Sequence, residues 1–144
     1  MLQIFALDTA QWKRLKVVLA IIYVSPYQKV IDVQEFIHRA LIDYTEEGSI
    51  LFSQYNKDFS KIPLILAGDL NINFSDEKSK PLIKFLLDTF NLKMNNDPNV
   101  FTTRYNTTID AVFSRYLEKV ESQTYVSYFS YHKPLISMIG CTDL

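Results

Sequence analysis

Polar side chains suited to catalysis stand at the ends of four apolar runs of the sequence. Asp69 and Asn71 come directly after "LILAG", at positions 64–68. The other three ends carry Tyr23 after "VVLAII", Asp110 after Ile109, and Ser130 with His132 before Lys133 and a proline. Two carboxylates, a carboxamide and an imidazole are the groups that metal-assisted hydrolysis of a phosphoester uses to activate water, orient it and stabilise the phosphoryl oxygens.

These residues need strands to position them, and the apolar runs supply the candidates. Strands are predicted over 2–7, 16–23, 64–67, 102–104, 108–113, 119–126 and 135–139, with a polar connection over 8–14. In layered α/β proteins, ligands bind just beyond the strand ends, where loops place side chains over the core. The four polar groups are expected to lie in such places.

Two helices are predicted between the strands. Asp32 and Glu35 have the spacing of a capping box that opens the first helix, and Gly48 is placed as its C-terminal cap. Pro81 suits the first turn of the second helix. Apolar residues recur at helical spacing in both segments, which predicts one buried stripe on each. The alternation of strands and helices indicates an α/β domain, and residues 1–144 are expected to form a single one.

The composition narrows the class of protein. Apolar residues make up 48% of the chain and charged residues 22%, and the net charge is −1. Because no global basic field is present, an anionic substrate would be held by a local cluster or by a bound cation. The single Cys141 excludes an internal disulfide framework and a thiolate metal site. With no secretory signal and no run long enough to span a bilayer, an intracellular location, cytoplasmic or nuclear, is expected.

The four segments, in their order, resemble the signatures of the endonuclease/exonuclease/phosphatase superfamily. They read "IIYVSP", "GDLN", "TIDAVFSR" and "SYHKP". The resemblance implies a four-layered α/β sandwich, with two packed mixed sheets and outer helices, and a Mg²⁺-dependent nuclease activity on DNA. The phrasing "TTRYNTTIDAVFSRYLE" is also similar to nucleases carried by eukaryotic transposable elements.

The resemblance assigns a role to each residue. Asp69 would activate the attacking water, and Asn71 would hydrogen-bond to that water or to the phosphate. His132 would contact the non-bridging oxygens, Asp110 would hold its ring in one tautomer, and Tyr23 would contact the phosphate or the leaving oxygen. On an extended segment Asp69 and Asn71 point to the same side, Leu70 points into the protein, and Gly68 allows a sharp turn at the strand end.

The chain departs from the family pattern in two places. Tyr131 stands where the closing motif has an aspartate, and a neutral phenol is a poor ligand for Mg²⁺. The Asn loop and the strand ending in a metal-binding Glu, which open the family's domain, have no counterpart ahead of Tyr23. The resemblance thus covers the C-terminal part of the family's domain. Weak or absent cleavage by this chain alone is expected, together with self-association through an unpaired sheet edge.

Several alternatives stay open from the residues alone. Arg104, Arg115, Lys119 and Lys133 either contact a phosphate backbone or form part of a solvated surface. Arg104, Lys133 and Ser130 are the expected substrate-binding residues. Phe101 and Tyr105 either stack on a base or, as is more common, pack in the core. The chain itself is either a nuclease domain, a catalytically silent remnant that binds nucleic acid or protein, or a phosphatase of the same superfamily.

Overall fold

The computed structural model describes residues 2–12, 15–51 and 58–140. The strands are β1 (Leu2–Trp12), β2 (Leu15–Val24), β3 (Leu64–Asp69), β4 (Lys93–Met94), β5 (Asp110–Arg115), β6 (Lys119–Thr124) and β7 (Leu135–Gly140). The α-helices are α1 (Val30–Leu41), α2 (Glu46–Leu51) and α3 (Lys80–Phe90), and the 3₁₀ turns are η1 (Ile42–Tyr44) and η3 (Glu77–Ser79). No helix in the described ranges is long and apolar enough to cross a membrane.

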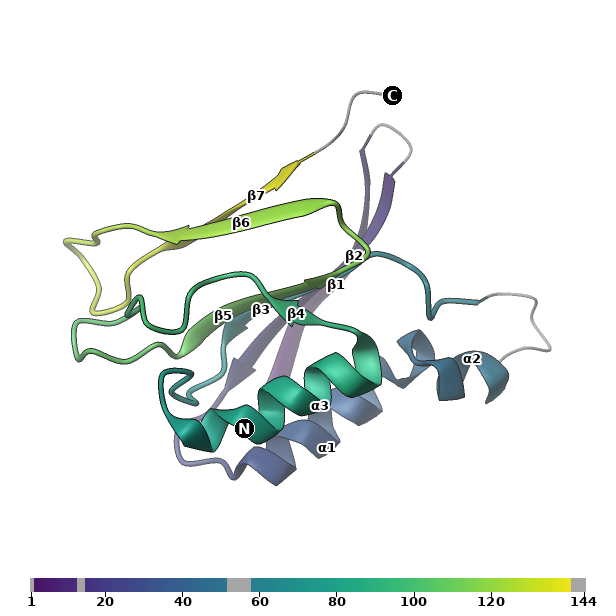
Figure 1. The fold of residues 1–144 in the computed structure, drawn as a ribbon, viewed down its shortest axis with the longest axis horizontal. Helices are drawn as coiled ribbons and strands as arrows, with labels where there is room; N and C mark the ends of the chain where they lie inside the picture. The colour runs from purple at the N-terminus through teal and green to yellow at the C-terminus, as the bar shows by residue number, and fades with distance from the viewer. Residues whose placement is uncertain (1, 13–14, 52–57, 141–144) are drawn as a thin grey trace.

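The elements form three layers (Figure 1). A five-stranded mixed sheet in the order β1-β2-β3-β5-β4 lies in the middle, with α1 and α3 on one face and the β6–β7 hairpin sheet over the other. β2 and β3 run parallel, whereas the other neighbouring pairs of the large sheet run antiparallel. Two sheets and α/β class are therefore confirmed. A fourth, helical layer over β6–β7 has no counterpart among the described residues.

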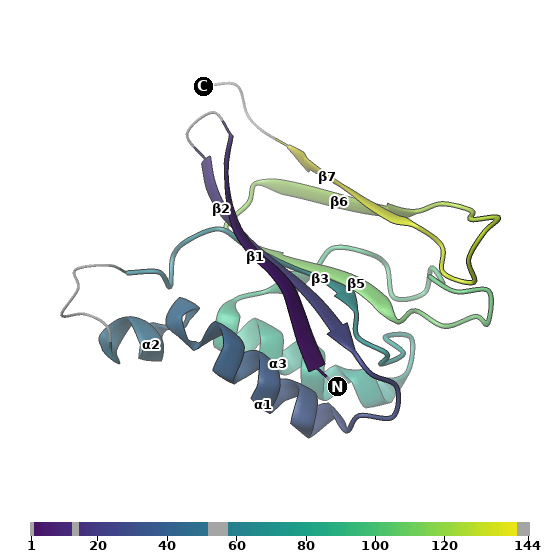
Figure 2. The same ribbon diagram turned by 180° about the vertical axis from the view of Figure 1, so that it is seen from behind.

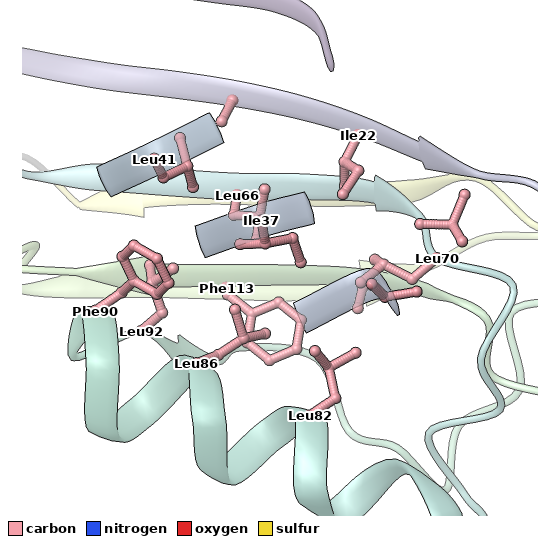
Figure 3. Close-up of a cluster of buried hydrophobic side chains, with 14 of the residues drawn as sticks. Ile22, Ile37, Leu41, Leu66, Leu70, Leu82, Leu86, Phe90, Leu92 and Phe113 are labelled. Carbon is pink, nitrogen blue, oxygen red and sulfur yellow. The ribbon is translucent and has the colours of Figure 1, made fainter. Parts of the chain in front are cut away.

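The core lies between the large sheet and the two long helices. Ile37 and Leu41 of α1 and Leu86 of α3 are fully buried and meet Leu66 and Phe113 of the sheet (Figure 3). Apolar helical stripes packed on a twisted sheet account for most of the buried side chains. The stripes predicted from the sequence are confirmed, as is Pro81 in the first turn of α3.

Four local predictions were wrong. α1 begins at Val30, so Asp32 lies in its first turn and is not its cap. Gly48 lies inside α2, where a Cβ atom would come within 1.9 Å of the Ile42 carbonyl oxygen, so close packing and not capping requires glycine. The predicted connection 8–14 is largely strand, because β1 pairs with β2 as far as Trp12. Residues 102–104 form no strand, although Thr103 makes an isolated bridge to His132.

Three apolar side chains of β7 stay exposed. Ile136 and Met138 are cross-strand partners of Gln123 and Glu121, and they lie on the hairpin face turned away from the large sheet. Ile139, on the opposite face, is 38% exposed. Ile136 and Met138 share the outer face with polar side chains of β6, and exposed apolar side chains on an isolated two-stranded sheet are candidates for an association surface.

Candidate functional site

The carboxyl end of β3, the start of β5 and the loop before β7 surround one open pocket of about 420 Å³. Asp69, Asp110, Ser130, His132 and Lys133 line it. Asp69 and Asp110 are register partners across β3 and β5. Directly paired side chains point to the same sheet face, so the two carboxylates lie side by side. This face is the one toward β6–β7, because the alternating residues Leu66 and Phe113 enter the helical core.

The His132 ring lies against both carboxylates. Its Nδ1 is 2.9 Å from Oδ2 and 3.1 Å from Oδ1 of Asp110, and its Nε2 is 3.7 Å from Oδ2 of Asp69. The contact with Asp110 favours a proton on Nδ1 and fixes the orientation of the ring. Nε2 is then the nitrogen that faces the pocket beside Asp69. The sequence-predicted pairing of Asp110 with His132 is the one the structure shows.

Asp69 lies in a less polar environment than an ordinary surface carboxylate. Burial raises its pKa, the hydrogen bond from the Asn71 amide lowers it, the nearby Asp110 charge raises it, and His132 lowers it. The net direction is upward. A carboxylate with a raised pKa binds a proton more readily, which suits a group that takes a proton from water.

Gly68 lies within β3 rather than at its end. Its φ is +147°, and a Cβ atom there would be 1.9 Å from the Ile22 carbonyl oxygen of β2. The strand continues through Asp69, so the expectation of a sharp turn at Gly68 was wrong. The glycine instead lets β2 approach closely, which sets Asp69 beside Tyr23 in the parallel register.

Asn71 does not extend the strand. Its φ is +48°, in the left-handed region, so the expected same-side projection of Asp69 and Asn71 on an extended segment is wrong. The Asn71 backbone N–H donates to Oδ1 of Asp69 at 2.9 Å, and its Nδ2 donates to the Val24 carbonyl at 2.7 Å. Asn71 thus holds the Asp69 carboxylate and ties the β3 end to the β2 end. Leu70 is fully buried, as predicted.

The remaining predicted residues lie around the pocket, and not all of them line it. Tyr23 is the cross-strand neighbour of Asp69 and is 38% exposed, but it does not line the pocket. The Ser130 hydroxyl accepts the His132 backbone N–H at 3.1 Å. The Arg104 guanidinium donates to the Ser127 carbonyl at 2.6 Å and remains exposed outside the pocket lining.

One cation and one aromatic residue were placed wrongly by the alternatives weighed from sequence. Arg115 is 4% exposed and lies in the core, so it neither contacts substrate nor belongs to a solvated surface. Lys119 forms an ion pair with Glu121 at 2.9 Å on the exposed face of β6, in agreement with the solvated-surface alternative. Tyr105 is 74% exposed, so core packing was the wrong expectation for it.

The sequence reasoning missed the threonines that hold the site together. Thr102 is fully buried, and its Oγ1 accepts the backbone N–H groups of Ile109 and Asp110 at 3.0 and 3.2 Å. Thr103 bridges to His132, and its hydroxyl bonds the Thr107 hydroxyl at 2.7 Å. The paired threonines at 102–103 and 107–108 around a short turn were the available signal. Together they fix Asp110 and His132 relative to each other.

The donor set fits a divalent cation. Asp69, Asp110 and His132 each offer one ligand atom, and these atoms lie within 4.8 Å of one another. Two carboxylates with one imidazole suit Mn²⁺ and related cations well, and they suit Mg²⁺ through the carboxylates. Asp110 is already bonded to the ring, which leaves Asp69 and Nε2 of His132 as the ligands facing the pocket.

Comparison with known proteins supports the fold. No family model and no curated protein sequence matches the chain. Among solved structures it is similar to a mannosyl-6-phosphatase of Bacteroides thetaiotaomicron VPI-5482, with a TM-score of 0.50 and 14% identity, over 90% of this chain and 53% of that one. The human Nocturnin catalytic domain gives 0.49 and 15%, over 90% and 50%. An endonuclease/exonuclease/phosphatase family protein of B. thetaiotaomicron gives 0.43 and 17%, over 85% and 49%.

These neighbours have the endonuclease/exonuclease/phosphatase fold, and the chain adopts part of that fold. It spans about half the length of the structures it resembles. The match agrees with the two-sheet α/β arrangement described above and with the family resemblance of the four sequence motifs.

Proposed function

We propose that this chain, which carries part of the endonuclease/exonuclease/phosphatase fold, supplies the Asp–Asp–His portion of a metal-dependent phosphodiesterase of nuclease type acting on DNA. The observation that carries the proposal is the position of His132, bonded to Asp110 on one nitrogen and facing Asp69 with the other. An imidazole between two carboxylates at the strand ends adds little to the stability of the fold. The same arrangement suits a site that stabilises the charge on a phosphoryl group.

Each side chain has a definite task in the proposed reaction. Asp69, with its raised pKa, orients the attacking water and takes its proton. His132, oriented by Asp110, donates from Nε2 to a non-bridging oxygen and stabilises the charge that develops at phosphorus. Asn71 holds Asp69 through its backbone amide. Tyr23, beside Asp69, is placed to contact the phosphate or the leaving oxygen.

A divalent cation, Mg²⁺ in the proposed enzyme, would be held by the Asp69 carboxylate and would neutralise phosphate charge, while Nε2 of His132 keeps its proton for the phosphate. Lys133 lines the same pocket, and Arg104 lies on the adjoining loop. In the proposed enzyme these two cations would contact the DNA backbone. Such contacts would hold the DNA without selecting its sequence.

The direct test is a plasmid-nicking assay with the 144-residue chain. Supercoiled DNA incubated with Mg²⁺ should convert slowly to the relaxed circle, and EDTA should stop the conversion because the cation is removed. The nicking activity should co-elute with the protein in size-exclusion chromatography. A parallel incubation with p-nitrophenyl phosphate distinguishes a phosphatase, and release of nitrophenolate without nicking would contradict the nuclease proposal.

We also propose that the chain self-associates through the β6–β7 sheet. Ile136 and Met138 leave an apolar strip on its outer face, and within the described residues no third strand pairs with this hairpin. Light scattering after size-exclusion chromatography should show a concentration-dependent dimer that the Ile136→Lys/Met138→Lys variant loses. A monomer at every protein concentration would contradict this proposal.

A further inference from the structure

Five exposed aromatic rings lie on two loops beside the candidate site, while Tyr27 and Tyr116 are exposed elsewhere. Large exposed aromatic side chains in the two neighbouring loops are Tyr105 (74%), Tyr125 (48%), Tyr128 (83%), Phe129 (102%) and Tyr131 (47%). The loops that carry them, 95–109 and 125–134, lie side by side at one end of the molecule in both views (Figures 1 and 2). Exposing this much aromatic surface has no benefit for folding, so it points to a ligand.

One of these rings packs against His132, and a second packs against the first. The Tyr131 ring centroid is 4.2 Å from that of His132 and 5.7 Å from that of Tyr105. The ring planes are tilted by 43° between His132 and Tyr131 and by 47° between Tyr131 and Tyr105, so the two tyrosines form an angled aromatic surface that begins at the imidazole and extends outward. We use the name aromatic shelf for these two residues.

Backbone pairing between the two loops makes the shelf rigid. The Arg104 N–H donates to the Tyr131 carbonyl at 2.9 Å, and the Lys133 N–H donates to the Thr102 carbonyl at 2.7 Å. The Arg104 side chain adds a bond to the Ser127 carbonyl at 2.6 Å. A ring pair anchored in this way loses little conformational freedom when a ligand stacks on it.

We infer that the aromatic shelf stacks an unpaired base of a single-stranded or locally opened nucleic acid whose phosphate lies at His132. The inference rests on the proposed function and adds the form of the substrate. Stacked bases inside an intact duplex present only their edges, whereas an unpaired base presents its whole face to a ring. Lys133 in the pocket and Arg104 beside the shelf supply the positive charge that the flanking phosphates require.

Tyr131 then has a role that its position in the closing motif does not suggest. A phenol is a weak ligand for a hard cation, but its ring is a good stacking surface. Tyr131 is therefore a substrate-binding residue at the edge of the site, and Tyr105 extends the same surface by one ring. The other three rings, Tyr125, Tyr128 and Phe129, lie earlier in the loop that carries Tyr131.

The experiment compares two labelled oligomers by fluorescence anisotropy in EDTA, so that binding is measured without cleavage. One is a ten-residue oligothymidylate, and the other is a ten-residue abasic oligomer of the same charge. Tyr105→Ala/Tyr131→Ala should weaken oligothymidylate binding about five- to one-hundred-fold and leave abasic binding unchanged. The Tyr105→Phe/Tyr131→Phe variant, which keeps both rings, should bind like the wild type.

Tyr116→Ala provides the matched control, because Tyr116 is exposed to a similar extent (49%) and follows the other end of β5. It should leave both affinities unchanged. Equal wild-type affinity for the two oligomers, or preference for a duplex of the same length, would overturn the inference. If the chain binds in a base-dependent way but does not nick DNA, only the proposed catalysis is contradicted. If it nicks DNA without base-dependent binding, only the role of the aromatic shelf is contradicted.

Discussion

Replacing Arg115 with methionine should lower the free energy of unfolding by about 3–5 kcal/mol, a large loss for a single substitution. The guanidinium is 4% exposed and donates to the backbone carbonyls of Tyr44, Phe59, Ile62 and Phe90 at 2.8–3.2 Å. These carbonyls belong to three separate segments, η1, the turn over 59–62 and the end of α3, which meet near the last residue of β5. Methionine fills a similar volume but leaves the acceptors without their donor.

Equilibrium denaturation in urea measures this loss, and Arg104→Met is the matched control. Arg104 also donates to a backbone carbonyl, that of Ser127, but it is exposed to water, which can replace the lost bond. The control should lose well under about 1 kcal/mol. Arg115→Lys should fall between the two, because one ammonium cannot reach four carbonyls in the fork geometry of arginine. Equal losses for the two methionine variants would show that Arg115 does not join these segments.

Arg115 also shows where sequence reasoning stopped short. The strand alternation in "DAVFSR" was enough to predict that Arg115 is buried, since Arg115 shares its face with Ala111 and Phe113, both of which are fully buried. Nothing nearby in sequence signals the acceptors, which lie 25 to 71 residues away. An arginine that follows an apolar strand is more often at the surface than buried. The sequence position of Arg115 near Asp110 therefore suggested a substrate contact that the structure does not have.

The site residues themselves were predictable because their order along the chain is tied to the topology. Asp69 ends a buried run and Asp110 begins another, and pairing of these two strands in register brings the carboxylates together. His132 joins them because the loop before β7 bridges to Thr103. The direction of Asn71 was not predictable from alternation, since asparagine readily adopts the left-handed conformation that turns it away from the strand.

In the β1–β2 hairpin, the sequence pattern missed part of a strand. Residues 8–12 read "DTAQW", with too little apolar character to predict a strand. They nevertheless continue β1, because β2 offers an unbroken row of backbone partners from Val24 back to Leu15. Pairing with a strong neighbouring strand outweighed a weak local preference. Such tertiary effects cannot be read from composition or periodicity alone.

Replacing Asp69 with asparagine should lower the rate of plasmid nicking about a hundred- to ten-thousand-fold. Asparagine keeps the shape of the side chain and an oxygen for the Asn71 amide, but it cannot take a proton from water and it binds a cation weakly. Asp97→Asn is the matched control, because Oδ1 of Asp97 accepts the Asn99 amide at 2.8 Å just as Asp69 accepts that of Asn71 at 2.9 Å. Asp97 lies on the exposed loop and not in the pocket.

The loss in Asp69→Asn should appear in the cleavage step and not in binding. Affinity for oligothymidylate in EDTA should stay within about twofold of the wild type, because the stacking rings and the flanking cations are unchanged. The Asp97→Asn variant should nick and bind like the wild type. Because the carboxylate of Asp69 is where the proposed reaction begins, equal nicking rates in Asp69→Asn and Asp97→Asn would place the chemistry elsewhere and leave the His132–Asp110 pair with a purely structural role.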